Sequence, residues 1–256
     1  MNTIQKTLFI GKELHQFDEI HSTNTYAAKL VAKSNPLDGT VITTYNQQKG
    51  KGQGGSLWES EPDKNISMTV ILQPRFVAAR DQFVLNQAIS LGVLDFVKTY
   101  ISTGAKIKWS NDIYVLDKKI AGILIQNSLV ARNIQHSIIG VGLNINQTVF
   151  KSDAPNPTSL KLETGKDFNL DDLLEMLCWK IEGRYLQLKA QAYQKIKSEY
   201  LDNLYQYMED KIYQIPDGDF FQGRIVGIGT YGKLLLETKE GMKEFDTKEV
   251  KFTPSP

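Results

Sequence analysis

Cysteine is almost absent from this chain, in which Cys178 is the single one among 256 residues. One cysteine excludes a disulfide within the chain and is typical of proteins from a reducing compartment. Long apolar runs are missing too, since none approaches the ~18 residues that a membrane-spanning helix needs. The first residues also lack the apolar core of a signal peptide. We therefore expect a cytoplasmic protein with no membrane segment.

A surplus of charge is missing as well, because 30 Lys and Arg residues balance 29 Asp and Glu residues to a formal net charge of +1. A domain dedicated to nucleic acid is usually clearly basic, so this balance argues against DNA as a partner. The chain has three histidines, and no His/Cys/Asp cluster has the spacing of metal ligands. We expect no metal site built from side chains alone.

The patterns that are present predict an α+β fold. Apolar residues at helical spacing predict helices over residues 82–101 and 192–207, a long helix that begins near 171–172, and a short helix capped by Ser22, Thr23 or Asn24. Short apolar runs predict strands over residues 40–45, 66–72, 107–109, 112–116, 120–126 and 134–146, with a hairpin turn at 117–118. We expect a mixed or antiparallel sheet with helices on one side.

The pattern of apolar residues changes after Asp210, from helical spacing to short runs. Short β-type runs follow, broken by turn residues at 216–218, 229–232 and 240–241. This pattern predicts a small β-barrel. We expect two domains, residues 1–209 and residues 210–256.

A glycine-rich segment, GKGQGGS at residues 50–56, follows the first predicted strand. Gly50, Gly52 and Gly55 match the dinucleotide fingerprint, but a strand follows instead of the helix that would hold the pyrophosphate. A Walker loop would need a lysine after the last glycine, and the kinase triplets are absent. What remains is a cationic loop with Lys49 and Lys51, either a surface hairpin or a lid over a ligand.

A second group of polar residues lies at 108–112 (KWSND) and 118–124 (KKIAGIL). A hairpin between these segments would bring Asn111, Asp112 and Lys119 within reach of one another. A lysine that points inward from an apolar strand needs an anionic partner. That partner is either Asp112, in a structural ion pair, or the carboxylate or phosphate of a ligand, and Gly122 would let a ligand approach the backbone.

Five segments, in this order, resemble the motif set of the biotin–protein ligases. They are STN (22–24), QQKGKGQGGSLWES (47–60), KWSNDIY (108–114), KKIAGIL (118–124) and GVGLNIN (140–146). The resemblance implies a catalytic domain like that of class II aminoacyl-tRNA synthetases, followed by a small Src-homology-3-like barrel. Only about 20 residues precede the STN segment, too few for a DNA-binding domain, so the chain resembles the monofunctional type.

The resemblance implies a two-step reaction. The carboxylate of biotin attacks the α-phosphorus of ATP, which gives biotinyl-5′-AMP and pyrophosphate. A lysine of the biotin carboxyl carrier domain of a carboxylase then attacks the mixed anhydride. Joining two anions requires preorganised cations, so we expect Mg²⁺ to accompany the substrates biotin and ATP.

The resemblance also assigns roles to individual residues. Lys119, Lys51 and Asp112 are the expected catalytic residues, and Asp112 would either orient Lys119 or accept the proton of the incoming lysine. The expected biotin-binding residues are Ser22, Thr23, Asn24, Gln47, Gly50, Lys51, Gly52, Gln53, Lys119, Gly122 and Leu124. The expected nucleotide-binding residues are Trp58, Asn111 and Asn144. Simpler structural roles stay open for three of them: a helix cap for Asn24, a loop anchor for Trp58 and a strand end for Asn144.

Several departures and alternatives remain. Lys51 and Gln53 stand where the family often has arginine, whose two-donor fork suits phosphate, so we expect weaker retention of the adenylate. Ser110 replaces a usual proline, and we attach no role to it. A lipoate–protein ligase would share the adenylation chemistry, and a non-catalytic biotin or nucleotide sensor is a third reading. A homodimer paired through a sheet edge is also open.

Overall fold

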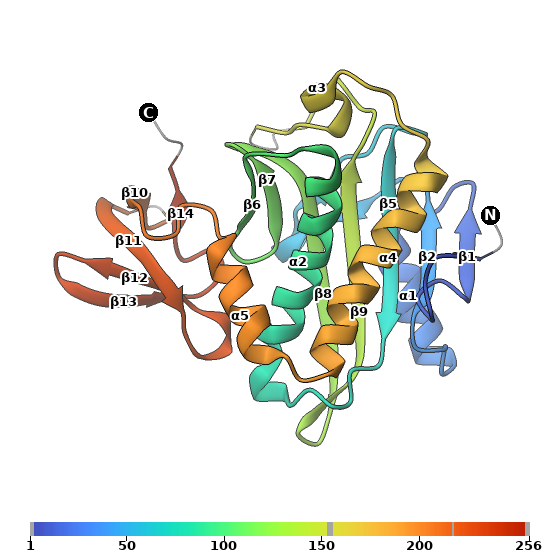
Figure 1. Ribbon diagram of the computed structural model, residues 1–256, viewed down its shortest axis with the longest axis horizontal. Helices are drawn as coiled ribbons and strands as arrows, with labels where there is room; N and C mark the ends of the chain where they lie inside the picture. Colours follow the sequence, from blue (N-terminus) through green and yellow to red (C-terminus); the bar gives the residue numbers. More distant parts are fainter. Residues whose placement is uncertain (1–2, 153–155, 217, 254–256) are drawn as a thin grey trace.

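A seven-stranded mixed sheet forms the centre of the computed structural model, which describes residues 3–152, 156–216 and 218–253 (Figure 1). Its strand order is β1-β2-β5-β9-β8-β7-β6. β1 and β2 run parallel, and all other neighbours are antiparallel. The strands are β1 (Leu14–Phe17), β2 (Thr40–Thr44), β5 (Asn65–Leu72), β6 (Ala105–Lys108), β7 (Asp112–Val115), β8 (Lys118–Val130) and β9 (Asn133–Asn144). The predicted mixed sheet is therefore confirmed.

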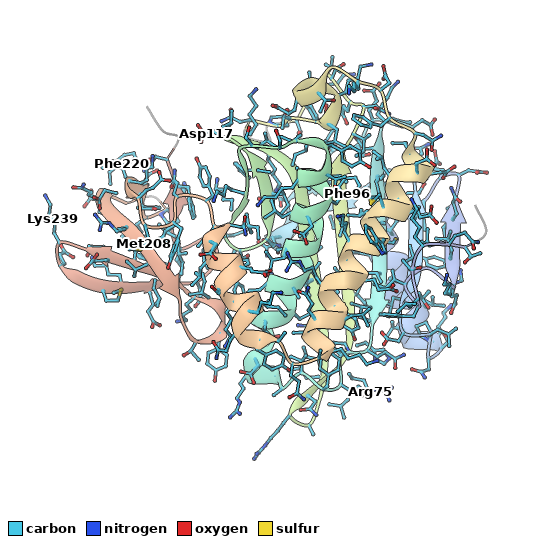
Figure 2. The ribbon with its side chains drawn as sticks, in the orientation of Figure 1. Arg75, Phe96, Asp117, Met208, Phe220 and Lys239 are labelled. Atoms are coloured by element: carbon cyan, nitrogen blue, oxygen red, sulfur yellow. The ribbon has the colours of Figure 1, made fainter. Side chains whose placement is uncertain are left out.

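Two long helices cover one face of this sheet, with α5 packed against α2 (Figure 1). The long helices are α2 (Phe83–Tyr100) and α4 (Leu170–Lys189), followed by α5 (Tyr193–Asp202), and the short helix α3 (Leu160–Thr164) precedes α4. The main core lies between them and the sheet, and Phe96 of α2, labelled in Figure 2, is fully buried there. Cys178 of α4 is buried in the same core, and burial raises the pKa of its thiol to about 12, so the thiol is inert packing.

The expectation of helices on one side only is wrong, because α1 (Thr23–Lys33) packs on the opposite face. Ala27 of α1 lies in a separate small core with Ile42 and Ile71. Side chains alternate along a strand, so Ile71 faces α1 while its neighbours Val70 and Leu72 face the main core. Both β2 and β5 are buried along their whole length, as strands covered on both faces must be.

Local signals explain most element ends. Ser22 is the cap of α1, since its Oγ accepts a hydrogen bond from the Thr25 amide at 3.4 Å. The helix predicted over 192–207 ends at Asp202 instead, because residue 204 pairs with Ile107 at the edge of the sheet. The hairpin turn lies one residue earlier than predicted, since Val115 pairs directly with Lys118. β1 and α3 were not predicted.

The C-terminal part forms a five-stranded antiparallel sheet with the order β13-β12-β11-β10-β14 (Figure 1). Its strands are β10 (Asp210–Gln214), β11 (Phe220–Ile228), β12 (Leu234–Thr238), β13 (Gly241–Phe245) and β14 (Lys251–Phe252). The turn predicted at 216–218 includes residue 217, which lies outside the described residues, as do residues 1–2, 153–155 and 254–256 within the predicted domain bounds. In the part of the chain that the structure describes, no helix is long and apolar enough to cross a bilayer.

Candidate active site

A cavity of about 210 Å³ lies on the face of the sheet that carries α1. Its floor is made by neighbouring strands: Gly122 and Leu124 of β8 pair directly with Gly142 and Gly140 of β9. Its walls come from the first turn of α1 and from the glycine-rich segment. The lining residues include Ser22, Thr23, Asn24, Gln47, Lys51, Gly52, Gln53, Ser67, Asp112, Lys119 and Lys248.

The side chains of Trp58 and Asn24 lie directly against the glycines of this floor. A Cβ atom at Gly142 would lie 2.4 Å from the indole of Trp58, and one at Gly140 would lie 2.1 Å from Oδ1 of Asn24. No side chain fits at these two positions without displacing a neighbour. The sequence analysis quoted both glycines within the GVGLNIN segment without assigning them a role. Their spacing of two residues, which places them on one face of a strand, was the signal that could have found them.

The wall near α1 is polar and partly unsatisfied. Oε1 of Gln47 accepts hydrogen bonds from the amide and the hydroxyl of Thr23, at 2.9 and 3.2 Å. Three lining residues hold a buried polar atom without a partner among the described residues: Nδ2 of Asn24, Oγ of Ser67 and Nε1 of Trp58. Such atoms cost free energy unless a ligand or water satisfies them. This wall therefore suits the part of a ligand that carries hydrogen-bond donors and acceptors.

A single ion pair stands at the other end of the cavity. Nζ of Lys119 lies 2.7 Å from Oδ2 of Asp112, and both side chains are partly exposed, 24% and 30%. The β7–β8 hairpin brings the two together, since Asp112 pairs with Gly122, three residues after Lys119. The backbone of Lys119 is held by bonds with Asn156 and Thr158. The predicted juxtaposition of Asp112 and Lys119 is thus present.

A second cavity of about 520 Å³ adjoins the first and shares this ion pair with it. Trp58 also lines both cavities, with its ring centroid 5.5 Å from Nζ of Lys119. Asn144 lines the second cavity, where its Nδ2 donates to the Thr158 carbonyl at 2.9 Å and its buried Oδ1 has no partner among the described residues. Two cavities joined at one lysine suit a ligand pair whose anionic groups meet at that lysine.

The glycine-rich segment forms a small hairpin over the cavity. β3 (Gly50–Lys51) pairs with β4 (Leu57–Trp58), and a 3₁₀ turn at Gln53–Gly55 connects them. Lys51, Gly52 and Gln53 line the cavity. Gly50 is not among the residues that line it. A Cβ there would lie 2.5 Å from the carbonyl oxygen of Trp58, so a glycine permits the close pairing of β3 with β4.

Asn111 is the second predicted residue that lines neither cavity. Its side chain is buried, with Nδ2 donating to the Ile123 carbonyl and Oδ1 accepting from Oγ of Ser110 at 2.8 Å. Both ends of the amide are therefore engaged within the hairpin. Among the described residues, no group of three or more His, Cys, Asp or Glu side chains could hold a metal ion.

Comparison with known proteins gives this site its context. The model of the biotin/lipoate A/B protein ligase family matches residues 17–144, a segment that holds the glycine hairpin, the ion pair and the glycine floor. The chain belongs to this family. The chain is 28% identical over 253 residues to the bifunctional ligase/repressor BirA of Bacillus spizizenii. The alignment covers 96% of this chain and 76% of that protein.

Two further comparisons, one of sequence and one of fold, give similar proteins. The chain is 27% identical over 241 residues to the biotin–[acetyl-CoA-carboxylase] ligase of Paracoccus denitrificans, covering 90% of this chain and 97% of that protein. Its mixed α/β fold is similar to that of the biotin protein ligase from Aquifex aeolicus, solved in complex with biotin and ATP. The TM-score is 0.78 at 24% identity, over 95% of this chain and 100% of that one.

Proposed function

We propose that this chain catalyses the ATP-dependent biotinylation of a lysine on a biotin carboxyl carrier domain, through biotinyl-5′-AMP. The observation that carries the proposal is the Lys119–Asp112 pair at the junction of a small polar cavity and a larger one. Family membership and the named activities of the relatives support the same reaction.

The small cavity suits the head of biotin. The ureido ring of biotin offers two N–H donors and one carbonyl acceptor. Thr23, Gln47 and Asn24 offer hydroxyl and amide groups that match both kinds. In this pose the carboxylate of biotin points to the other end of the cavity and meets Lys119.

The larger cavity suits the nucleotide, with Trp58 and Asn144 in its wall. The α-phosphate would then lie near Lys119, whose cation stabilises the negative charge that develops as the carboxylate attacks. Lys51, on the glycine hairpin, would supply a second cation at the same place. Asp112 holds Lys119 in position and is the candidate base for the acceptor lysine in the second step.

Mg²⁺ fits this site as a companion of the triphosphate. Mg²⁺ usually keeps several waters and binds substrate phosphates with one or two carboxylates. Asp112 lines both cavities and could contribute one such carboxylate. When bound, the ion would neutralise charge on the pyrophosphate that leaves.

Lipoate–protein ligation is the second candidate, because the family includes enzymes of both kinds. The dithiolane ring of lipoate has no N–H donor or carbonyl acceptor. It would leave the polar atoms of Asn24 and Ser67 buried and unpaired. The polar wall therefore favours biotin.

We also propose a division of the chain into a catalytic domain, residues 1–209, and a small domain, residues 210–256. The catalytic domain would be related to class II aminoacyl-tRNA synthetases, and the C-terminal sheet to Src-homology-3 barrels. The change from helices to short antiparallel strands at β10 supports this division. A homodimer stays a prediction, for which the sheet edge at β1 is the candidate contact, because residues 203–205 already bond to the edge at β6.

The proposed function is tested by label transfer. The full chain is incubated with ATP, a carrier domain, and radiolabelled biotin or lipoate in separate reactions. We expect label on the carrier with biotin and at most a trace with lipoate. Transfer of lipoate alone would replace the proposal with its alternative, and binding of biotin without transfer would indicate a non-catalytic protein.

A further inference from the structure

The turn between β13 and β14 reaches the glycine hairpin from the C-terminal sheet. Lys248 in this turn lines the small cavity. Its Nζ donates a hydrogen bond to the carbonyl oxygen of Gly54, at 3.2 Å, across 194 positions of sequence. A residue of the C-terminal sheet therefore completes the wall of a site that otherwise belongs to the central sheet.

The structure of the turn holds Lys248 in this place. The amide of Glu249 donates to the Asp246 carbonyl at 3.0 Å, and the amide of Asp246 donates to Oε2 of Glu249 at 2.7 Å. Phe245 and Val250 anchor the turn because both are buried. Lys248 itself has a φ of 76°, a conformation that costs free energy for any residue except glycine. The surroundings thus fix a strained backbone that aims a lysine at the hairpin.

The charge of Lys248 is not neutralised within the protein. Of the acids in its turn, Asp246 pairs with Lys233 at 3.4 Å, and Glu249 closes the turn. No ion pair joins Lys248 to a carboxylate in residues 3–152, 156–216 or 218–253. Its partner is a neutral carbonyl at the rim of a cavity. A cation left uncompensated at such a rim attracts an anionic ligand.

We propose that Lys248 is a positioning residue that latches the glycine hairpin shut over an anionic acyl-adenylate. The identity of the ligand rests on the proposed function, whereas the latch itself is a contact between two parts of the protein. Gly54 and Gly55 both have positive φ, so the 3₁₀ turn between β3 and β4 is built from residues with much backbone freedom. A hydrogen bond from a cation on a fixed turn restrains this freedom where it is greatest.

Trypsin tests the latch in the ligand-free protein, because Lys49 and Lys51 place cleavage sites in the hairpin. We expect Lys248→Ala to be cut there about five- to tenfold faster than the wild type, the effect of losing one hydrogen bond. Lys248→Arg should restore slow cleavage. Lys239→Ala is the matched control: it removes the same charge at the outer end of the C-terminal sheet (Figure 2). A cleavage rate unchanged in Lys248→Ala would overturn the proposal.

A second pair of variants tests the same contact from the other side. A Cβ at Gly54 would lie 1.9 Å from Nζ of Lys248, whereas one at Gly55 would meet open space. Both glycines have positive φ, so alanine strains the backbone at either position. Adding Lys248→Ala should not accelerate cleavage of Gly54→Ala but should accelerate cleavage of Gly55→Ala. Equal acceleration in both backgrounds would show that the latch does not exist.

Retention of the intermediate separates the latch from the proposed function. Enzyme loaded with biotin and ATP is freed of excess ligand, and the half-life of bound biotinyl-5′-AMP is measured. We expect Lys248→Ala to shorten it by the same five- to tenfold. An unchanged half-life would overturn the role in retention. If the wild type forms no adenylate while Lys248→Ala is still cut faster, the proposed function fails and the latch stands.

Discussion

The reaction proposed above depends most on the ion pair between Lys119 and Asp112. Stability alone does not account for it, because partly exposed ion pairs contribute only ~0–1 kcal/mol. The pair lies at the junction of two cavities, beside the Trp58 ring. A cation held there by one carboxylate is preorganised for a second anion, as the proposed reaction requires.

Replacing Lys119 by alanine should abolish most adenylate formation. We expect kcat/KM for this step to fall by about 10²–10³-fold, the usual effect of removing one donor that faces developing charge. Lys118→Ala is the control, because the neighbouring side chain points to Glu163 at 3.7 Å, outside both cavities. Pyrophosphate release measures the step. Equal losses in the two variants would argue against a specific role for Lys119.

Replacing Asp112 by asparagine tests its role as a base in the second step. An amine is mostly protonated at pH 7 and must lose a proton before it attacks. We expect transfer from preformed biotinyl-5′-AMP to slow by at least about 100-fold, with recovery as the pH approaches the pKa of the acceptor lysine. Transfer at the wild-type rate at pH 7 would leave Asp112 only the task of orienting Lys119.

Most of the residues that line the cavity could be named from the sequence, because they lie in segments that resemble the motifs of biotin–protein ligases. For Thr23 and Gln47 that resemblance was the ground, whereas the hairpin pattern by itself already placed Lys119 beside Asp112. Gly140 and Gly142 were missed because a glycine in a strand has many explanations until its neighbours are known. Lys248 gave no signal at all, because its position depends on how the C-terminal sheet docks. The roles of all these residues, including the retention effect of Gln53, remain predictions.

At the scale of elements, the β3–β4 hairpin and the floor of β8 and β9 both line the small cavity. The two have opposite properties. The floor is fixed by a long ladder of strand pairing, whereas the hairpin pairs through only two residues on each strand. Ligand binding should therefore change the hairpin and leave the floor as it is.

Residues 49–57 should become protected from trypsin when the intermediate forms. Ordering each residue costs ~1–2 kcal/mol, so the bond from Lys248 restrains the hairpin only in part until contacts with a ligand offset that cost. We expect cleavage after Lys49 and Lys51 to slow at least tenfold with biotin and ATP together, and less with ATP alone. Cleavage after Lys239, on the far end of the C-terminal sheet, serves as the internal reference. Identical digestion with and without ligands would contradict a lid.

The floor should not tolerate alanine at position 142. The added Cβ would lie 2.4 Å from the Trp58 indole and push the ring toward the cavity. We expect KM for ATP to rise at least tenfold and stability to fall by ~1–3 kcal/mol, the usual cost of overpacking. Gly227→Ala in β11 is the control, since its Cβ would meet Leu235 at an ordinary 3.7 Å. Both quantities come from steady-state kinetics and urea unfolding.

The elements were predictable where local pattern decides them, and less so where tertiary contacts do. The apolar spacing in residues 82–101 identified α2 almost to the residue. The prediction of helices on one side only was wrong, although the adjacent apolar residues Val41-Ile42 of β2 and Val70-Ile71-Leu72 of β5 were a sign of burial on both faces. α5 ends early because residue 204 pairs with β6, and a pairing partner distant in sequence leaves no local trace.

At the scale of the whole molecule, the C-terminal sheet is joined to the rest by a continuous core. Phe245 and Val250 belong to the same buried cluster as residues of α2 and the central sheet. Nε1 of Trp109 donates to the Gly232 carbonyl at 2.9 Å, which fixes the loop between β11 and β12. The latch at Lys248 depends on this docking, so the small sheet should unfold together with the large one.

Gly232→Ala should weaken the docking and lower the stability of the entire chain. Gly232 has a φ of 87°, and a Cβ there would lie 2.2 Å from the ring of Phe83. Gly241→Ala is the matched control, because φ is also positive but the Cβ meets open space. We expect a single unfolding transition in both variants. The free energy of unfolding should fall by ~1–3 kcal/mol more in Gly232→Ala than in the control. Two separate transitions in calorimetry would show that the sheets unfold independently.

The glycine floor has a consequence for anyone who wants this enzyme to accept larger biotin analogues. A pocket is usually widened by shortening the side chains that line it, but Gly122, Gly140 and Gly142 have no side chains to shorten. The glycines of the floor therefore offer nothing to trim. Space for a bulkier analogue must come from Leu124, which does carry a side chain in this floor, or from the hairpin above.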